Sequence, residues 1–183
     1  MATTSVVAQE SFSRISLSGF TVNLTQSNLY SIETDPNIEV ERKVENGTLY
    51  IGVIDQTGTV PKSTISISVN ELSYLELHNS NLIMESPVIV DTLDIELNSS
   101  FGTLKVNAKS LSITVGAGAR FSVEGNARQL ICNVGAASNL SASKLTANQA
   151  SLSVVGHSYL TVNAQEVISL ECDKTSRVTN VSK

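Results

Sequence analysis

Two glutamates, Glu76 and Glu96, are the residues of this chain whose spacing could support chemistry. Each lies between two apolar residues, so on a strand it would point outward while its neighbours point inward. If their segments stack as equivalent strands of adjacent turns, the carboxylates lie about 5 Å apart, which is the separation of a retaining glycosidase pair. No arginine, lysine or histidine is placed to polarise a substrate. We therefore interpret both as solvated acids at equivalent positions and predict no catalytic residue.

The two histidines, His78 and His157, do not form a metal site in this interpretation. Both fall in corner positions, four turns apart, which separates them by roughly 19 Å along the stacking direction. Metal binding needs ligands gathered at one point, and a catalytic triad needs a histidine with an orienting acid. Neither histidine has an evident partner in the sequence. We predict solvent-facing turn residues, with no metal and no cofactor.

The chain has two cysteines, Cys132 and Cys172. In the repeat described below they lie two turns apart, or about 9–10 Å along the stacking direction. A disulfide needs Cα atoms about 4.4–6.8 Å apart. The prediction is two reduced, buried thiols that act as small hydrophobic side chains.

The elements that must position these side chains recur every 18 to 20 residues from about Tyr74 onward. Each unit has an anchor residue, with an apolar residue two positions before it. The anchors are Leu77, Leu97, Val115, Val134, Val154 and Cys172. A fixed period of this length with alternation inside it is typical of a solenoid, in which each turn buries its inner face on its neighbours. The anchors should therefore stack in one column.

Small or polar residues follow each anchor, as in Gly116-Ala-Gly-Ala, and favour a tight corner with positive φ angles. A second short strand comes after the corner. Parallel strands joined by crossovers are almost always right-handed. The sequence therefore predicts an all-β protein, a right-handed parallel β-helix with about six rungs over residues 71–183. A left-handed hexapeptide helix fits less well, because its six-residue step fails at Thr146 and Glu166.

Residues 12–70 read differently from the repeats. Period-two alternation runs from Ile15 to Leu24, and Asn46-Gly47 between two alternating runs is a strong hairpin signal. Antiparallel pairs here would cover the open end of the solenoid. We expect 12–70 to form an N-terminal cap and opening turns, 12–183 to be a single domain, and 1–11 to be a disordered or tag-like N-terminus.

The net charge of −5 divides unevenly along the chain, with 13 acids and 4 bases before Leu97 and 4 acids and 8 bases from Leu97 onward. Bases this dispersed do not make the dense basic face that nucleic acid requires. The asymmetry could support association of unlike ends with a partner or a second copy. No segment approaches the roughly 20 apolar residues of a membrane span, and the sequence contains no recognisable export signal.

Several motifs resemble the autotransporter-adhesin head domain, also called the GIN domain, of bacterial cell-envelope proteins. They are Phe20-x-Val-x-Leu-x-Gln, Asn46-Gly-Thr-Leu-Tyr-Ile and repeats such as Leu111-Ser-Ile-Thr-Val-Gly-Ala-Gly-Ala. The similarity covers nearly the whole chain, although the Gly-Ser-Gly corner of the family is replaced at Asn79-Ser-Asn and Gly135-Ala-Ala. The resemblance implies an exported protein that acts in adhesion without catalysis.

Together these observations favour a non-catalytic, extracytoplasmic β-solenoid with adhesive or envelope-interaction function. Its partner would be a protein or glycan surface, and it could form homo-oligomers through solenoid faces or ends. Two alternatives remain. One is a polysaccharide-active β-helix enzyme using Glu76 and Glu96. The other is a carbohydrate-binding module, which the absence of tryptophan and the presence of only four tyrosines disfavour.

Overall fold

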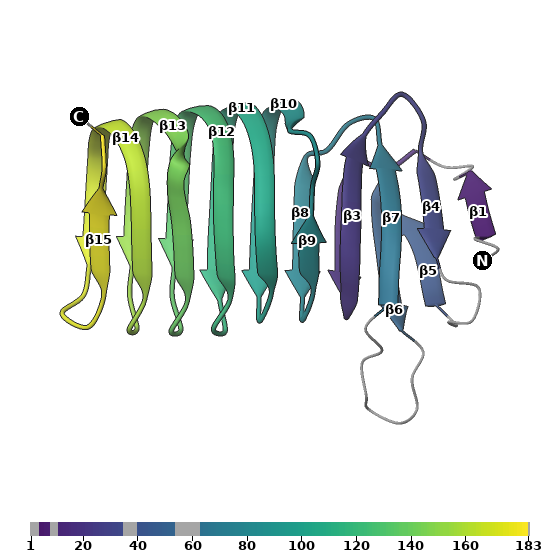
Figure 1. The fold of residues 1–183 in the computed structure, drawn as a ribbon, viewed down its shortest axis with the longest axis horizontal. Coiled ribbons are helices and arrows are strands. Elements are labelled where there is room, and N and C mark those ends of the chain that lie inside the picture. Colours follow the sequence, from purple (N-terminus) through teal and green to yellow (C-terminus); the bar gives the residue numbers. More distant parts are fainter. Residues whose placement is uncertain (1–3, 8–10, 35–39, 54–62, 183) are drawn as a thin grey trace.

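The computed structural model describes residues 4–7, 11–34, 40–53 and 63–182 of the chain (Figure 1). The strands before the repeats are β1 (Thr4–Val7), β2 (Arg14–Ser18), β3 (Phe20–Gln26), β4 (Ser31–Thr34), β5 (Val40–Glu45), β6 (Thr48–Val53) and β7 (Ser63–Val69). The strands of the repeats are β8 (Tyr74–His78), β9 (Asn81–Ile83), β10 (Val88–Asn98), β11 (Phe101–Gly116), β12 (Arg120–Val134), β13 (Asn139–Val154), β14 (Tyr159–Cys172) and β15 (Arg177–Asn180).

These strands form two facing layers, named here as they lie in Figure 1. The front sheet contains β4, β7, β3, β9 and β15, and the rear sheet contains β5, β6, β2 and β8. Strands β11 to β14 begin in the front sheet, bend over the top and end in the rear sheet. Successive turns pair in parallel. This arrangement confirms the predicted β-solenoid.

The predicted anchors occupy one column inside the rear sheet. Strand register places each anchor directly opposite the next, and it adds two residues from the N-terminal part. The complete column is Ile51, Leu17, Leu77, Leu97, Val115, Val134, Val154 and Cys172. All of them except Cys172 are buried, with at most 4% of their surface exposed. Alternation of apolar and polar residues thus predicted the core correctly, because successive strand residues point to opposite faces.

The N-terminal turns do not stack in chain order. Strand β2 pairs in parallel with β6 on one side and β8 on the other, and β3 pairs in the same way with β7 and β9. The turn formed by residues 14–26 therefore lies between the turn of residues 48–69 and that of 74–83. The connection after β7 returns past it, and the Ser73 amide donates to the Ser13 carbonyl at 2.7 Å.

Antiparallel strands complete the N-terminal end, as the sequence predicted. Strands β5 and β6 form the expected hairpin, in which Glu45 pairs with Thr48 around Asn46 and Gly47, both with positive φ. Strand β4 pairs antiparallel with β7, and β1 pairs with β4. Residues Thr4–Val7 therefore belong to the folded structure, although the sequence analysis assigned 1–11 to a disordered or tag-like segment. The rest of 1–10 lies outside the described residues.

The corners contain positive φ angles, as the sequence predicts. Alanine adopts them as well as glycine and asparagine: φ is 53° at Ala117 and 52° at Ala136. Backbone hydrogen bonds between corners stabilise this geometry, such as that from Gly118 to the Ala136 carbonyl at 2.9 Å. Stacking on the adjacent corner thus imposes a conformation that is locally unfavourable for alanine.

A column of small residues lies beneath the corners and was not predicted. Each member is the residue just before the first residue of a front-sheet strand, and these first residues pair with one another from turn to turn. The members are Ser80, Ser100, Ala119, Ser138, Ser158 and Ser176. The amide of one serine donates to the hydroxyl of the next, from Ser80 to Ser100 at 3.1 Å and from Ser138 to Ser158 at 3.2 Å. These bonds satisfy buried backbone groups at each bend.

Candidate binding face

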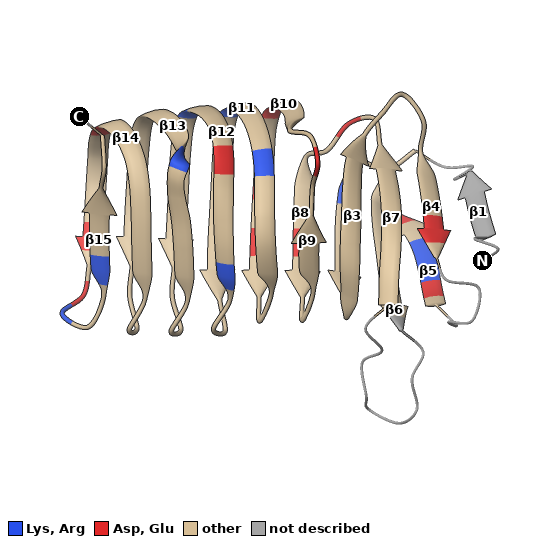
Figure 2. Cartoon of the chain, viewed as in Figure 1, with Lys and Arg blue, Asp and Glu red and all other residues tan. Residues whose placement is uncertain are grey.

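The outward side of the rear sheet concentrates charged and aromatic residues near the N-terminal end. Strand register sets Arg14, Tyr74 and Asp94 in one row and Ser16, Glu76 and Glu96 in the next. His78 ends β8, and exposed Tyr50 lies opposite Ser16 on β6. We call these eight residues the rear polar cluster. Figure 2 shows that the visible front of the repeats also carries charged residues, on β11, β12, β13 and β15.

The predicted stacking of Glu76 and Glu96 is confirmed, because the two residues are partners on adjacent parallel strands. Glu76 is half-buried and accepts a hydrogen bond from Ser16 at 2.6 Å. Burial acts to raise the pKa of Glu76, but the hydrogen bonds from Ser16 and His78 outweigh it, so the pKa is lowered. A glycosidase acid needs the opposite shift, toward a raised pKa.

His78 has a partner that the sequence analysis did not find. Its Nε2 lies 2.9 Å from Glu76 Oε1, whereas His78 had been predicted to lack an orienting acid. The order of groups nevertheless differs from a catalytic triad, in which the histidine lies between the nucleophile and the acid. Here Glu76 lies between Ser16 and His78. His157 occupies a corner with a φ of 63°, as expected for a turn residue.

Tyr74 links the two glutamates to Arg14. The Arg14 guanidinium carbon lies 4.2 Å from the centre of the Tyr74 ring, which is a cation–π distance. Burial, the negative charges of Glu76 and Glu96, and a hydrogen bond with Glu96 raise the pKa of Tyr74 to about 12. The phenol therefore stays protonated to a higher pH than an ordinary tyrosine. The result is a pre-arranged surface of ring, cation and carboxylates.

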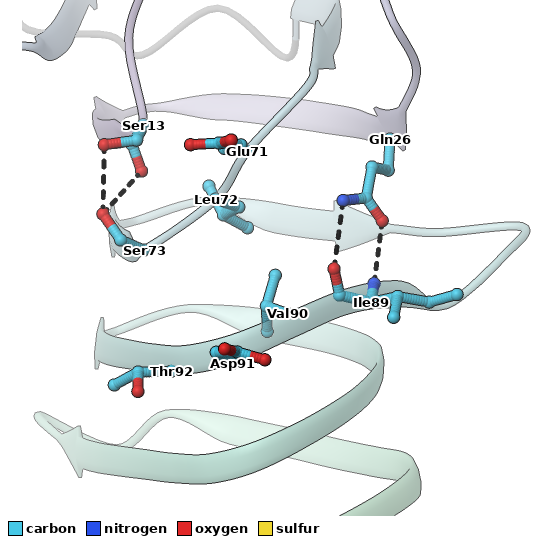
Figure 3. A pocket seen from close by; sticks show the side chains of 9 residues that line it. All are labelled: Ser13, Gln26, Glu71, Leu72, Ser73, Ile89, Val90, Asp91 and Thr92. Atoms are coloured by element: carbon cyan, nitrogen blue, oxygen red, sulfur yellow. Dashed lines mark hydrogen bonds between the residues drawn. The ribbon is translucent and has the colours of Figure 1, made fainter.

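A hollow of about 440 Å³ opens where the connection after β7 passes the turn of residues 14–26 (Figure 3). Its wall is fixed by Gln26, whose side-chain amide donates to the Ile89 carbonyl at 3.1 Å and accepts from the Ile89 amide at 2.8 Å. The side chain of Gln26 thus makes the two hydrogen bonds with the Ile89 backbone, near the start of β10, that the backbone of a neighbouring strand would otherwise make. It is the glutamine of the Phe20-x-Val-x-Leu-x-Gln motif, and its role here is to join turns.

Neither cysteine forms a disulfide, as predicted. Cys132 is buried, and burial raises the pKa of its thiol to about 12. The prediction that Cys172 is also buried is wrong, because it is exposed. Its register in the core column is the predicted one, but the last turn leaves it uncovered. Among the described residues, no group of three or more His, Cys, Asp or Glu side chains could hold a metal ion.

Comparisons with known proteins identify the family to which this chain belongs. Residues 11–182 match the family described as "Putative auto-transporter adhesin, head GIN domain". The chain therefore belongs to this family, as the motifs suggested. No curated protein matches the chain. Within the described residues, no helix is long and apolar enough to cross a membrane.

Solved structures share the fold at low sequence identity. A protein from Bacteroides fragilis described as a putative adhesin aligns with a TM-score of 0.83 and 18% identity, covering 98% of this chain and 96% of its own. A putative adhesin from Parabacteroides merdae has a TM-score of 0.75 and 18% identity, with 98% and 95% covered. A protein from Parabacteroides distasonis described as a putative lipid binding protein has a TM-score of 0.62 and 17% identity, with 98% and 96% covered.

Proposed function

We propose that this protein is a non-catalytic adhesive domain that acts outside the cytoplasm and binds a protein or glycan surface. The observation that carries the proposal is its membership, over residues 11–182, in the GIN adhesin-head family. Its structural neighbours described as adhesins support the same function. The chemistry of Glu76 supports the absence of catalysis, because its pKa is lowered and it is engaged by Ser16 and His78.

The rear polar cluster is the surface we assign to binding. The exposed Tyr50 ring and the partly exposed Tyr74 ring, over which Arg14 lies, offer flat apolar area, and the Glu96 and Asp94 carboxylates can accept hydrogen bonds from a ligand. Such a combination suits sugar rings, which present C–H faces and hydroxyl groups, and it also suits polar peptide segments. Rigid aromatic and charged anchors of this kind lose little conformational entropy when they bind.

Binding of the labelled, purified protein to bacterial and host cell surfaces would test this assignment. The variant Tyr74→Ala with Glu96→Gln should lose binding by at least about tenfold, as expected when anchor residues are removed from an interface. The matched control is Thr114→Ala, which lies next to Glu96 on the following strand and also points outward. Unchanged binding by the double variant would overturn the assignment of this face. Treating the cells with protease or with periodate distinguishes a protein partner from a glycan.

The enzymatic alternative predicts a different result. Incubation of the protein with pectin-like and other surface polysaccharides should release no new reducing ends. Depolymerisation by the unmodified protein that disappears in Glu76→Gln would show that the two stacked carboxylates are catalytic, and it would overturn the proposal. Fractionation of cells that produce the full-length gene product tests the location, because an adhesive role requires the domain outside the cytoplasm.

A further inference from the structure

A row of aromatic, basic and amide side chains crosses the outer side of the front sheet, next to the corners. Each member is the first residue of a front-sheet strand in the repeats, and strand register sets it beside the next member. We call this set the front row. In order from β9 to β15 its members are Asn81, Phe101, Arg120, Asn139, Tyr159 and Arg177. All of them are exposed except Asn81, which is half-buried.

The two aromatic rings of the front row are open to solvent. Phe101 is 56% exposed and Tyr159 is 54% exposed. Each pairs with an arginine on the following strand, Phe101 with Arg120 and Tyr159 with Arg177. Among the described residues, the one guanidinium–ring contact lies in the rear polar cluster, so neither arginine of the front row covers the ring beside it. Both rings therefore offer a face on which a ligand can stack.

The pair of ring and arginine occurs twice, in the same order, and the two pairs are three strands apart. Because adjacent strands lie about 4.8 Å from each other, the two pairs are separated by roughly 14 Å along the stacking direction. Asn139 lies between them, beside Arg120 on one side and Tyr159 on the other, and its amide can both donate and accept hydrogen bonds. A ligand that contacts both pairs must be extended and must repeat its own chemistry, as a polymer does.

The charge of this surface selects an anionic polymer. The parts of β11 to β15 that lie in the front sheet carry four bases and one acid (Figure 2), which are Lys105, Arg120, Lys144, Arg177 and Glu124. Lys144 neutralises Glu124 at 2.9 Å, and within the described parts of the chain neither arginine forms an ion pair. The rear polar cluster instead has three carboxylates and one guanidinium. An anionic ligand is therefore attracted to the front face and repelled by the rear cluster.

A row of hydroxyl groups lies beside the front row, two residues further along each strand. Its members pair from strand to strand and are half-buried, and they are Thr103, Ser122, Ser141 and Thr161. Hydroxyl groups donate and accept hydrogen bonds, as the hydroxyl groups of sugars do. Nucleic acid would require a denser set of bases than four over five strands. Rings, hydroxyl groups and a few cations together suit a charged polysaccharide better.

We propose that the front face binds a polysaccharide whose sugars carry carboxylates, with the polymer lying along the stacking direction. Sugar rings stack on Phe101 and Tyr159, and carboxylates pair with Arg120 and Arg177, since the guanidinium fork matches a carboxylate. Two such sites on one rigid surface strengthen the binding of a single chain, because the second contact is intramolecular. This is a second surface, and the inference does not depend on the rear polar cluster.

Binding to immobilised polygalacturonate, measured by biolayer interferometry, tests the role of the arginines. Arg120→Gln with Arg177→Gln should raise the Kd at least about tenfold, because two charge-assisted contacts are lost. The matched control is Lys109→Gln with Arg128→Gln, which changes the net charge equally at exposed residues beyond the front part of β11 and β12. This control should leave the Kd nearly unchanged. Equal weakening by the two double variants would show that only overall charge matters, and the proposal would fail.

A second pair of variants tests the rings. Phe101→Ala with Tyr159→Ala should also raise the Kd at least about tenfold, as expected for aromatic anchors. Ile131→Ala, which removes an apolar side chain that is 42% exposed on the rear sheet, should not. Urea unfolding of each variant checks that its stability is unchanged.

The choice of polymer separates an acidic polysaccharide from the other possible ligands. Fully methyl-esterified polygalacturonate has the same sugar rings without their charge and should bind at least about tenfold more weakly. Absence of binding to polygalacturonate, or equal binding to its ester, would overturn the proposal. An oligothymidylate that binds more tightly and displaces polygalacturonate would show that the rings stack on bases, and it would replace the polysaccharide with a single-stranded nucleic acid.

Discussion

Ser100 and Ser138 occupy equivalent positions in the column beneath the corners, yet their hydroxyl groups have different surroundings. Ser100 Oγ accepts a hydrogen bond from the Ser80 amide at 3.1 Å and lies within donating distance of the Asn98 carbonyl, at 2.8 Å. Ser138 Oγ is equally buried and has no hydrogen-bond partner in the part of the chain that the structure describes. Replacing each serine with alanine therefore isolates the contribution of the hydrogen bonds.

We expect Ser100→Ala to destabilise the protein by about 2 kcal/mol, because it removes a net hydrogen bond and leaves the buried Ser80 amide without its acceptor. For a chain of this size, that corresponds to a fall in Tm of roughly 4–8 °C. Ser138→Ala should change the free energy of unfolding by less than about 0.5 kcal/mol, since its hydroxyl makes no bond that can be lost.

The neighbouring residue Ala119 explains this difference and supplies a third variant. At this place in the column alanine has no hydroxyl, and its amide donates to the Gly116 carbonyl at 3.2 Å instead of to Ser138. Ala119→Ser should therefore give the Ser100 amide an acceptor and stabilise the protein by about 1 kcal/mol. Equilibrium urea unfolding monitored by circular dichroism measures all three variants. Equal destabilisation by Ser100→Ala and Ser138→Ala would refute the reasoning.

Three further predictions concern the corners and the core. Ala136 is exposed with a φ of 52°, so Ala136→Gly should stabilise the protein by about 0.5–1 kcal/mol in urea unfolding, whereas Ala108→Gly, which is outside this φ region, should not. A backbone hydrogen bond from Gly156 lowers the pKa of Asp173, so this carboxylate stabilises the last corner at neutral pH, and its contribution is lost as pH falls through the lowered pKa. Amide protection at Gly156 should accordingly persist well below the ordinary carboxyl range and be absent at neutral pH in Asp173→Ala. Cys132 should react with a thiol reagent in the Cys172→Ser background only at the rate of unfolding, and fast labelling of the native protein would contradict its burial.

The sequence predicted the structure best where the type of a residue alone determines a local feature, such as whether its side chain is buried or whether the chain turns. The alternation and period of the anchors predicted which side chains point inward, because an apolar residue in strand register must be buried if the turns stack. Asn46-Gly47 predicted the β5–β6 hairpin for a similar reason, since this dipeptide favours the turn locally. The outward stacking of Glu76 and Glu96 followed from the same register.

Features that depend on contacts between distant parts of the chain were not predictable. Alternation in β2 and β3 showed which face is buried but not that these strands lie between β6–β7 and β8–β9. Gln26 contacts Ile89 across 63 residues, and nothing in the local sequence indicates that contact. The burial of Cys172 was predicted wrongly because its register is correct while the following turn, which would have covered it, is incomplete.

The position of β2 and β3 inside the stack has a consequence for biogenesis. These strands are synthesised early, yet both of their neighbours on either side are synthesised later, the last of them ending at Ile83. A growing solenoid that simply added turns from the N-terminus could not produce this order. Residues 14–26 must remain accessible until the flanking turns arrive, so folding of this end is delayed relative to its synthesis. Deleting the first 26 residues would, for the same reason, remove an interior layer and not an end.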